Sequence, residues 1–348
     1  MLLPCSTNKL LSHWQGPNRI IKKVSENSCC VELENGANRV LHGNKLRPFI
    51  RRVQSIGVIY EADSEMGELE YCPYDEGEKD RRTAIEDLNL SYLDEKRGKE
   101  LRTLLMKYVN VFDDRPGECG LVEHEIKILE NVVPRKQRPY RVPEKLKIEL
   151  DKQIDYLLET GKIRPSKSPW SHPVVCVVKK DSSIRMCVDL RAINSYTIAD
   201  AFPTSRIEDI LMPVGDSKYM TALDCSSGYW QLKMNPLHSH RTAFITHRGL
   251  FEWVVMPFGA KTSSQSFIRC MEILLHPHSL YANAFIDDSI VFSKSWGQHL
   301  VHLDNVLKSF EEAGLTLKLS KCVFAKQKIN FWDTKFRRVR DRLILTKF

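Results

Sequence analysis

The stretch that decides the fold is Ala284-Phe285-Ile286-Asp287-Asp288-Ser289-Ile290-Val291-Phe292. Two apolar, strand-forming runs flank two adjacent carboxylates, and only those two residues are left to turn the chain. A tight β-hairpin would therefore place Asp287 at its tip, beside Asp288. Adjacent acids are also common in ordinary exposed turns, so this stretch alone fits a purely structural role as well.

A second acid stands in a similar context, in Met220-Thr221-Ala222-Leu223-Asp224-Cys225-Ser226-Ser227-Gly228-Tyr229. Asp224 ends an apolar strand and precedes a turn of small residues. If the two strands are neighbours, three carboxylates meet at one edge of a sheet, where their repulsion would raise their pKa values. Divalent cations relieve that repulsion, and oxygen ligands favour Mg²⁺. Two such ions can hold the attacking and leaving oxygens in phosphoryl transfer.

The elements around these acids predict an α+β fold with an antiparallel sheet rather than a doubly wound parallel one, because adjacent strand pairs alternate irregularly with helices. The expected strands are 174–178, 185–188, 218–223, 230–234, 242–245, 251–255, 282–286 and 289–292. The expected helices start at Ser91, which would cap the first, and cover 143–160, 206–211, 264–275 and 298–313.

The N-terminal part predicts a separate module. Residues 1–54 contain short apolar runs separated by turn signals, among them the hairpin dipeptide Asn35-Gly36, and would form a small five-stranded, SH3-like β-barrel. Residues 55–90 predict an acidic, flexible linker, because the run 61–80 has nine acids and one lysine. Residues 91–348 form the remaining region.

Composition narrows the functional classes. The chain has 348 residues, which suggests two or three domains, and its 42% hydrophobic content is typical of a globular protein. No stretch is long enough for a membrane helix, and proline at position 4 argues against a signal peptide. Ten scattered cysteines fit a reduced, intracellular protein, in a cytoplasmic particle or the nucleus, that is not secreted. Net charges of +6 in residues 1–60 and +10 after residue 80 suggest two contacts with polyanions, although charge alone favours ordinary solvated surfaces.

Residues 120–331 carry a series of motifs in one order. The motifs are Gln137-Arg138-Pro139-Tyr140-Arg141-Val142-Pro143, Gly161-Lys162-Ile163-Arg164-Pro165-Ser166-Lys167-Ser168-Pro169-Trp170, Lys179-Lys180-Asp181, Arg185-Met186-Cys187-Val188-Asp189-Leu190-Arg191 with Asn194, Leu223-Asp224, Ser227-Gly228-Tyr229, Thr242-Ala243-Phe244, Val255-Met256-Pro257-Phe258-Gly259, Phe285-Ile286-Asp287-Asp288, His299-Leu300 and Lys321-Cys322. With these motifs, the region resembles the reverse transcriptase of gypsy-type LTR retrotransposons.

This resemblance implies a right-hand polymerase with palm and fingers, whose thumb is truncated, acting on dNTPs and an RNA or DNA template with its primer. It assigns two Mg²⁺ ions, or Mn²⁺ instead, to Asp224, Asp287 and Asp288. The residues that it assigns to the nucleotide are Lys179, Arg185, Tyr229, Phe258 and Gly259. Tyr229 would exclude a 2′-hydroxyl. The residues that it assigns to the template and primer are Arg191, Asn194, Phe331 and Trp332.

The chain departs from the family pattern at several places. Phe285 replaces the more usual Tyr, Cys225-Ser226 follows Asp224, and Ile268 replaces Gln. The usual small-Asn-Ala-Pro run reads Lys261-Thr262-Ser263-Ser264, and Phe331-Trp332-Asp333 replaces the Phe-Leu-Gly that grips the primer end. Because Asp333 adds bulk and negative charge near the primer backbone, we expect weak, non-processive extension, which Asp333→Gly should improve more than Phe285→Tyr does.

Residues 1–50 separately resemble the C-terminal module of the integrases of the same elements. The matching pieces are Leu10-Leu11, Trp14-Gln15-Gly16-Pro17 and His42-Gly43-Asn44-Lys45-Leu46-Arg47-Pro48. Such a module would bind DNA or chromatin, and it belongs to a Pol polyprotein.

Two further hypotheses stay open. The chain could be a decayed or co-opted fragment that binds nucleic acid without efficient polymerisation, or an unrelated metal phosphotransferase with a similar palm. The second does not explain the fingers motifs. Separately, we expect nucleic acid to bind along the basic residues of 134–185, mostly through phosphate contacts.

Overall fold

The computed structural model describes residues 2–4, 12–14, 19–25, 28–32, 38–42, 58–60, 81–178, 184–203, 210, 212–215, 217–327, 329–331, 334–339 and 342–347. The chain divides into two compact units, Met1–Ser55 and Ile56–Phe348, and the division lies one residue beyond the expected end of the N-terminal module.

The described strands of the smaller unit form two antiparallel sheets. Strands β1 (Leu2–Pro4) and β2 (Ser12–Trp14) pair with each other, and β3 (Arg19–Ser25), β4 (Ser28–Glu32) and β5 (Asn38–His42) form a three-stranded sheet. The β4–β5 hairpin spans the predicted turn, and its last pair is Glu32 with Asn38. The described strands form these two sheets and not the expected five-stranded barrel, because no ladder among them joins β1–β2 to β3–β5.

Two described segments of the predicted linker belong to the larger unit. Strand β6 (Val58–Tyr60) pairs in parallel with β9 (His172–Val178). Helix α1 (Arg81–Glu86) buries Ile85 completely, and Leu90 is 6% exposed. The assignment of residues 81–90 to the linker is therefore wrong, because their apolar side chains belong to the core. Residues 61–80 lie outside the described part of the chain.

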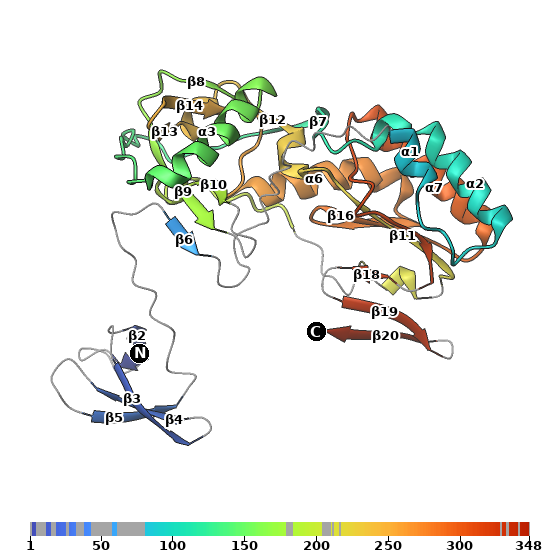
Figure 1. Cartoon of the computed structure of the whole chain (residues 1–348), viewed down its shortest axis with the longest axis horizontal. Coiled ribbons are helices and arrows are strands. Elements are labelled where there is room, and N and C mark those ends of the chain that lie inside the picture. Colours follow the sequence, from blue (N-terminus) through green and yellow to red (C-terminus); the bar gives the residue numbers. More distant parts are fainter. Residues whose placement is uncertain are drawn as a thin grey trace. The chain divides into compact units, whose positions relative to one another are not determined.

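An antiparallel sheet organises one half of the larger unit, in the strand order β15-β16-β11-β17 (Figure 1). Its strands are β15 (Ala282–Phe285), β16 (Asp288–Ser293), β11 (Tyr219–Asp224) and β17 (Val323–Lys326). Because side chains alternate along a strand, one face sends Leu223 and Val291 into the main core. The helices over that core are α2 (Glu95–Lys107), α6 (Ser263–Leu275) and α7 (Trp296–Glu312). The other face packs Ile290 and Phe292 against Val214.

A mixed six-stranded sheet organises the other half, in the order β10-β9-β13-β14-β8 with β6 beside β9. The remaining strands are β10 (Ile184–Val188), β13 (Phe244–Thr246), β14 (Gly249–Trp253) and β8 (Ile163–Pro165). Helix α3 (Glu144–Glu159) covers it, and Ile154 and Leu157 pack on Phe244 and Trp253 in one core. The α+β prediction is thus confirmed, with one antiparallel and one mixed sheet.

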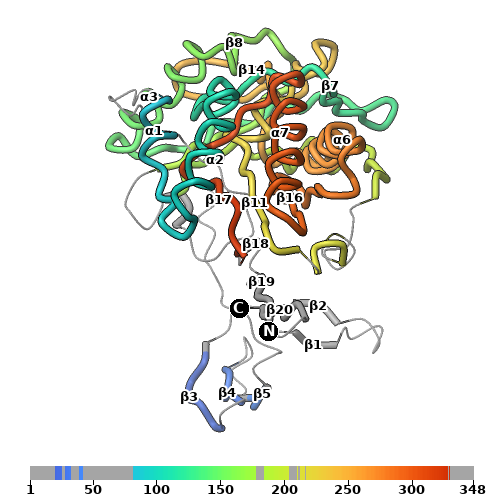
Figure 2. The backbone as a smooth tube through the Cα atoms, turned by 90° about the vertical axis from the view of Figure 1, so that its right-hand side faces the viewer, coloured from blue at the N-terminus to red at the C-terminus, as the bar shows by residue number. Residues whose placement is uncertain are grey.

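Shorter elements connect these layers. They are η2 (Val109–Val111), β7 (Cys119–His124), α4 (Arg191–Asn194), η3 (Met212–Val214), η4 (Gly228–Gln231), β12 (Leu232–Met234), η5 (Ser239–Thr242), η6 (His276–His278), β18 (Asn330–Phe331), β19 (Thr334–Val339) and β20 (Arg342–Lys347). Strand β12 pairs with β7, and β18, β19 and β20 form a separate antiparallel sheet. Figure 2 shows α7 and α6 side by side next to β16.

Three local predictions need correction or lie outside the described residues. Helix α2 is capped by Asp94, whose carboxylate accepts a hydrogen bond from the amide of Arg97 at 2.8 Å, and not by Ser91. Trp230 lies in η4 and not in a strand, because the turn after Asp224 continues through it. Most of the predicted helix 206–211 lies outside the described part.

Candidate active site

The backbone register brings the three acids together. Asp224 lies directly opposite Asp288 in the β11–β16 ladder, and opposite residues of an antiparallel pair have Cα atoms about 5 Å apart. Phe285 pairs with Asp288, so the β15–β16 turn consists of Ile286 and Asp287. The predicted convergence of Asp224, Asp287 and Asp288 is confirmed. The predicted turn is wrong by one residue, because Asp288 is already in the ladder.

The turn has a strained residue next to the exposed acid. Ile286 has a φ angle of 56°, in the left-handed region that β-branched residues rarely adopt. Asp287 follows it and is exposed, whereas Asp288 is half-buried. Such strain persists only where the surrounding structure enforces it, and it is frequent at functional sites.

The charges of the three acids act on the same buried group. Burial raises the pKa of the Cys225 thiol, and the charges of Asp224, Asp287 and Asp288 raise it further. The charge of Asp287 also adds to the effect of burial in raising the pKa of the Tyr229 hydroxyl. The carboxylates, Cys225 and Tyr229 therefore share one electrostatic environment.

Backbone hydrogen bonds hold the segment that carries Asp224. The amide of Lys318 donates to the Asp224 carbonyl at 2.9 Å, and the amide of Ser226 donates to the Thr316 carbonyl at 3.1 Å. The buried Gln231 joins the two segments. Its amide group donates to the carbonyls of Ser226 and Thr316, and its oxygen accepts from the Thr316 amide. Sequence reasoning missed Gln231 and Thr316, because their contact spans 85 residues.

Four of the residues assigned to nucleotide or template lie in one cluster. The rings of Tyr229 and Phe258 stack with centroids 4.9 Å apart and an interplanar angle of 20°. The Asn194 amide donates to the Gly259 carbonyl at 2.8 Å, and its oxygen accepts from the Lys261 amide at 2.9 Å. Gly259 has a φ angle of 81°, which suits glycine. Asn194 thus supports the loop that carries Phe258 and Gly259.

Arg191 is held beside this cluster by Asp189. The guanidinium Nε donates to the Asp189 carboxylate at 2.7 Å, and Tyr140 donates to the same carboxylate at 3.2 Å. Burial works to raise the pKa of Asp189, but the hydrogen bonds from Arg191 outweigh it and lower that pKa. Because 63% of the Arg191 side chain stays exposed, its outer face is available for a ligand.

Arg185 is in a different position from the one expected. It lies in the six-stranded sheet, is 8% exposed and lines a cavity of about 20 Å³ with Tyr156 and Trp253. A contact with the triphosphate of a nucleotide would require this side chain to leave the cavity.

The other predicted site residues lie elsewhere. Phe331 pairs with Thr334 at the β18–β19 turn, and Lys179, Trp332 and Asp333 lie outside the described residues.

The donor set of the three acids fits a hard divalent cation. All of the donors are carboxylate oxygens, and Mg²⁺ is bound by one or two carboxylates together with waters and substrate phosphates rather than by a complete protein cage. In the structure, the side chains of the described residues, the three acids included, form no group of three or more His, Cys, Asp or Glu arranged to hold a metal ion.

Part of the chain matches a known protein family. Residues 177–333 match the family model described as reverse transcriptase (RNA-dependent DNA polymerase). The chain contains a reverse-transcriptase domain. Reverse transcriptases use divalent metal ions, in agreement with the acidic donor set. The matched residues do not reach residues 1–54, so the integrase resemblance stays a prediction.

Two relatives that match the chain are retrovirus-related Pol polyproteins. The chain is 32% identical over 260 residues to the retrovirus-related Pol polyprotein from transposon 297 of Drosophila melanogaster, and 34% identical over 243 residues to that from transposon opus. These matches cover 72% and 66% of this chain. The chain spans about a quarter of the length of these relatives, 24% of each.

Solved structures of the same class share the fold. The foamy viral protease-reverse transcriptase in complex with double-stranded DNA matches with a TM-score of 0.67 and 25% identity, covering 76% of this chain and 46% of that one. The foamy viral protease-reverse transcriptase in complex with an RNA/DNA hybrid matches with a TM-score of 0.67 over 74% of this chain and 34% of that one.

Within the described residues, no helix is long and apolar enough to cross a membrane.

Proposed function

We propose that the reverse-transcriptase domain is an RNA-directed DNA polymerase of an LTR retrotransposon that adds dNTPs to a primer by two-metal nucleotidyl transfer. The observation that carries this proposal is the cross-strand pair Asp224–Asp288 with Asp287 at the adjoining hairpin tip. The relatives in complex with double-stranded DNA and an RNA/DNA hybrid support a primer–template as the substrate.

The geometry divides the work among the residues of this chain. Asp224 and Asp288 sit on paired strands and would hold the metal ligand positions rigidly, while the exposed Asp287 reaches the substrate side. When bound, Mg²⁺ or Mn²⁺ would lower the pKa of the primer 3′-hydroxyl and balance the charge of the phosphates. Tyr229 and Phe258 would form an aromatic wall beside the sugar, and Arg191 would contact the template backbone.

The test is primer extension on an RNA template with Mg²⁺ and purified chain. Wild type should add dNTPs, and Asp287→Asn should slow addition by roughly 10³-fold or more, because the substitution removes a charge used for metal binding. Asp114→Asn is the matched control, since Asp114 is an exposed acid outside the site. Extension that survives Asp287→Asn, or none by wild type, would contradict the proposal.

We propose that nucleic acid also contacts the extended basic segment before α3. Arg135, Lys136, Arg138 and Arg141 are exposed there, as is Lys167 after β8. The expectation that Lys162 and Arg185 belong to this surface is wrong, because they are 7% and 8% exposed. Binding should weaken steeply with salt, and each lost phosphate contact should reduce the slope of log K against log salt by about 0.9. An unchanged slope after Arg138→Ala and Arg141→Ala would contradict this surface.

The second candidate function is nucleic-acid binding with little polymerisation. It is favoured by Asp333, which stands where the resemblance has a glycine at the primer end. Primer extension distinguishes the two functions: this candidate predicts tight primer–template binding with short products, and longer products from Asp333→Gly than from Phe285→Tyr. Equal product lengths from all three chains would contradict the role of Asp333.

The remaining proposals concern the context of the domain. We propose that residues 1–54 bind DNA or chromatin as an integrase-type module and that the protein is intracellular. The sulfurs of Cys119 and Cys270 lie 3.4 Å apart, at hydrogen-bond distance and not at that of a disulfide, which supports a reducing compartment.

A further inference from the structure

Tyr229 is fixed at its backbone by a close approach to helix α6. The preceding residues are Ser227, with a φ angle of 46°, and Gly228. A Cβ on Gly228 would lie 2.8 Å from Cζ of Phe267, so only glycine fits between η4 and α6 without displacing that ring. The start of the tyrosine side chain is therefore set by packing.

The ring of Tyr229 is in contact with two aromatic neighbours. It stacks on Phe258 and packs at a tilt on Phe267, with centroids 4.9 Å and 5.6 Å away. These contacts are apolar and non-directional, so neither of them bonds the hydroxyl end of the ring. A polar contact at the hydroxyl would add a directional constraint.

Ser264 makes this polar contact. Its Oγ shares a hydrogen bond of 2.9 Å with the Tyr229 hydroxyl. Ser264 lies in the first turn of α6, where the hydroxyl of the preceding Ser263 donates to the Pro257 carbonyl at 2.9 Å and the Ser263 amide donates to Ala260. Ser264 thus tethers Tyr229 to the same rigid segment that carries Phe258.

This contact is a feature of this chain and not of the motif that it resembles. In the run Lys261-Thr262-Ser263-Ser264, serine occupies the place of the usual proline. Proline has no side-chain hydroxyl and could not bond Tyr229.

We propose that Ser264 is a positioning residue for sugar selection, and that it keeps Tyr229 in the place where the ring excludes a nucleotide carrying a 2′-hydroxyl. This inference rests on the proposed polymerase function and deepens it. Because the ring is tethered, a ribonucleotide can displace it only by breaking the hydrogen bond with Ser264 as well as the stacking contact with Phe258. Without the bond, the phenol can shift away from the sugar, and ribonucleotides become easier to accommodate.

The experiment measures single-turnover incorporation of a dNTP and of the matching NTP, each as rate constant over apparent Kd. Ser264→Ala should reduce the preference for dNTP about five-fold, as expected for the loss of one net hydrogen bond. The change should appear mainly as tighter apparent binding of the NTP, with little change for the dNTP. Ser264→Thr keeps a hydroxyl and should restore the preference.

A double-mutant cycle separates positioning from a general effect on the helix. Tyr229→Phe should lower the preference as Ser264→Ala does, and the double variant should be no worse than either, because the two changes remove one bond. Ser266→Ala is the matched control: it deletes another hydroxyl of α6, one bonded to His124 at 2.8 Å, and should leave the preference unchanged.

The outcomes distinguish this inference from the function on which it rests. If wild type adds no nucleotide, the proposed function is refuted and the inference with it. If wild type adds dNTPs but Ser264→Ala keeps the wild-type preference, or if the losses of the two single variants add up in the double variant, the inference alone is refuted. A loss of preference in Ser266→Ala equal to that in Ser264→Ala would also refute it.

Discussion

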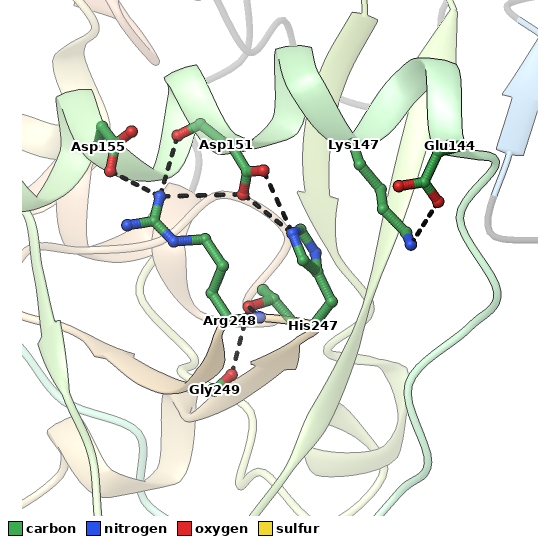
Figure 3. A network of polar contacts seen from close by, with 8 residues as sticks. Glu144, Lys147, Asp151, Asp155, His247, Arg248 and Gly249 are labelled. Carbon is green, nitrogen blue, oxygen red and sulfur yellow. Dashed lines mark hydrogen bonds and ion pairs between the residues drawn. The ribbon is translucent and has the colours of Figure 1, made fainter.

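The four-stranded and the six-stranded sheet of the larger unit differ in the contacts that join them to the neighbouring helices. The four-stranded sheet is held by a hydrogen-bonded group around the fully buried His299 of α7, whose ring bonds Thr221 of β11 and Ser293 of β16. The six-stranded sheet is joined to α3 by the buried hydrogen bonds of Gln153 with Ile184 and Met186 and, at its β13–β14 turn, by partly exposed ion pairs of Arg248 (Figure 3).

The two sheets also differ in where their charged side chains lie. The four-stranded sheet gathers its acids at the end of a ladder, with Asp287 exposed, whereas the six-stranded sheet and the turn before it bury Arg185 and Lys162. The acids therefore lie on a sheet that is held by buried contacts. Arg185, which was expected to bind phosphate from the six-stranded sheet, would have to move to do so.

The largest effect is expected at Gly314, which follows α7, one of the helices over the core of the four-stranded sheet. Gly314 has a φ angle of 72°, and a Cβ there would lie 2.5 Å from the Glu118 carbonyl oxygen. Gly314→Ala should lower the free energy of unfolding by about 3 kcal/mol, through backbone strain and a backbone clash. Gly297→Ala is the control, since nothing lies within 4 Å of its added Cβ in α7, and it should stabilise slightly. Urea unfolding that gives equal values for the two variants would break the comparison.

The next effect is the pH dependence of the same sheet. Burial, with a smaller effect of His302, lowers the pKa of His299 to about 3, and its ring nitrogens bond Thr221 and Ser293. Below pH 6.5 His299 is protonated in the unfolded chain but stays neutral in the folded chain. The contribution of His299 to the free energy of unfolding is therefore complete above pH 6.5 and falls as the pH falls toward 3. Between pH 7.5 and pH 5, His299 should account for a loss of about 2 kcal/mol in the free energy of unfolding.

The control for this pH effect is His299→Gln, which cannot titrate. Its free energy of unfolding should be lower at pH 7.5 but should fall less between pH 7.5 and pH 5 than that of wild type. Equal falls for the two chains would show that His299 does not set the acid sensitivity.

The smallest effect is expected at the exposed ties of the second sheet. Arg248 contacts Asp155 of α3 at 2.6 Å, with 33% and 52% of the two side chains exposed. Asp155→Asn should cost about 0.5 kcal/mol, because exposed ion pairs contribute little, and 1 M salt should remove the difference. Glu95→Gln, which breaks the exposed pair with Lys99 within α2, is the matched control. A loss comparable to that of Gly314→Ala would remove the contrast between the two sheets.

Local patterns were enough to predict the parts of the site that depend on nearby residues. Apolar runs next to Asp287 and Asp288 predicted the hairpin, since both strands and the turn lie within twelve residues. The apolar face of residues 143–160 predicted α3 in the same way. The cap of α2 was misassigned, because Ser91 and Asp94 carry equivalent capping signals and only the backbone geometry selects Asp94.

What the sequence by itself determined is therefore the acidic hairpin, the strand that ends in Asp224 and the resemblance that joins them. Tertiary structure alone decided that Asp224 lies opposite Asp288, that Arg185 is buried and that Ser264 bonds Tyr229. The physical reason is range: hairpins and helix faces follow from a few adjacent residues, whereas a ladder register, a buried cation and a side-chain bond across 35 residues depend on how separate elements pack.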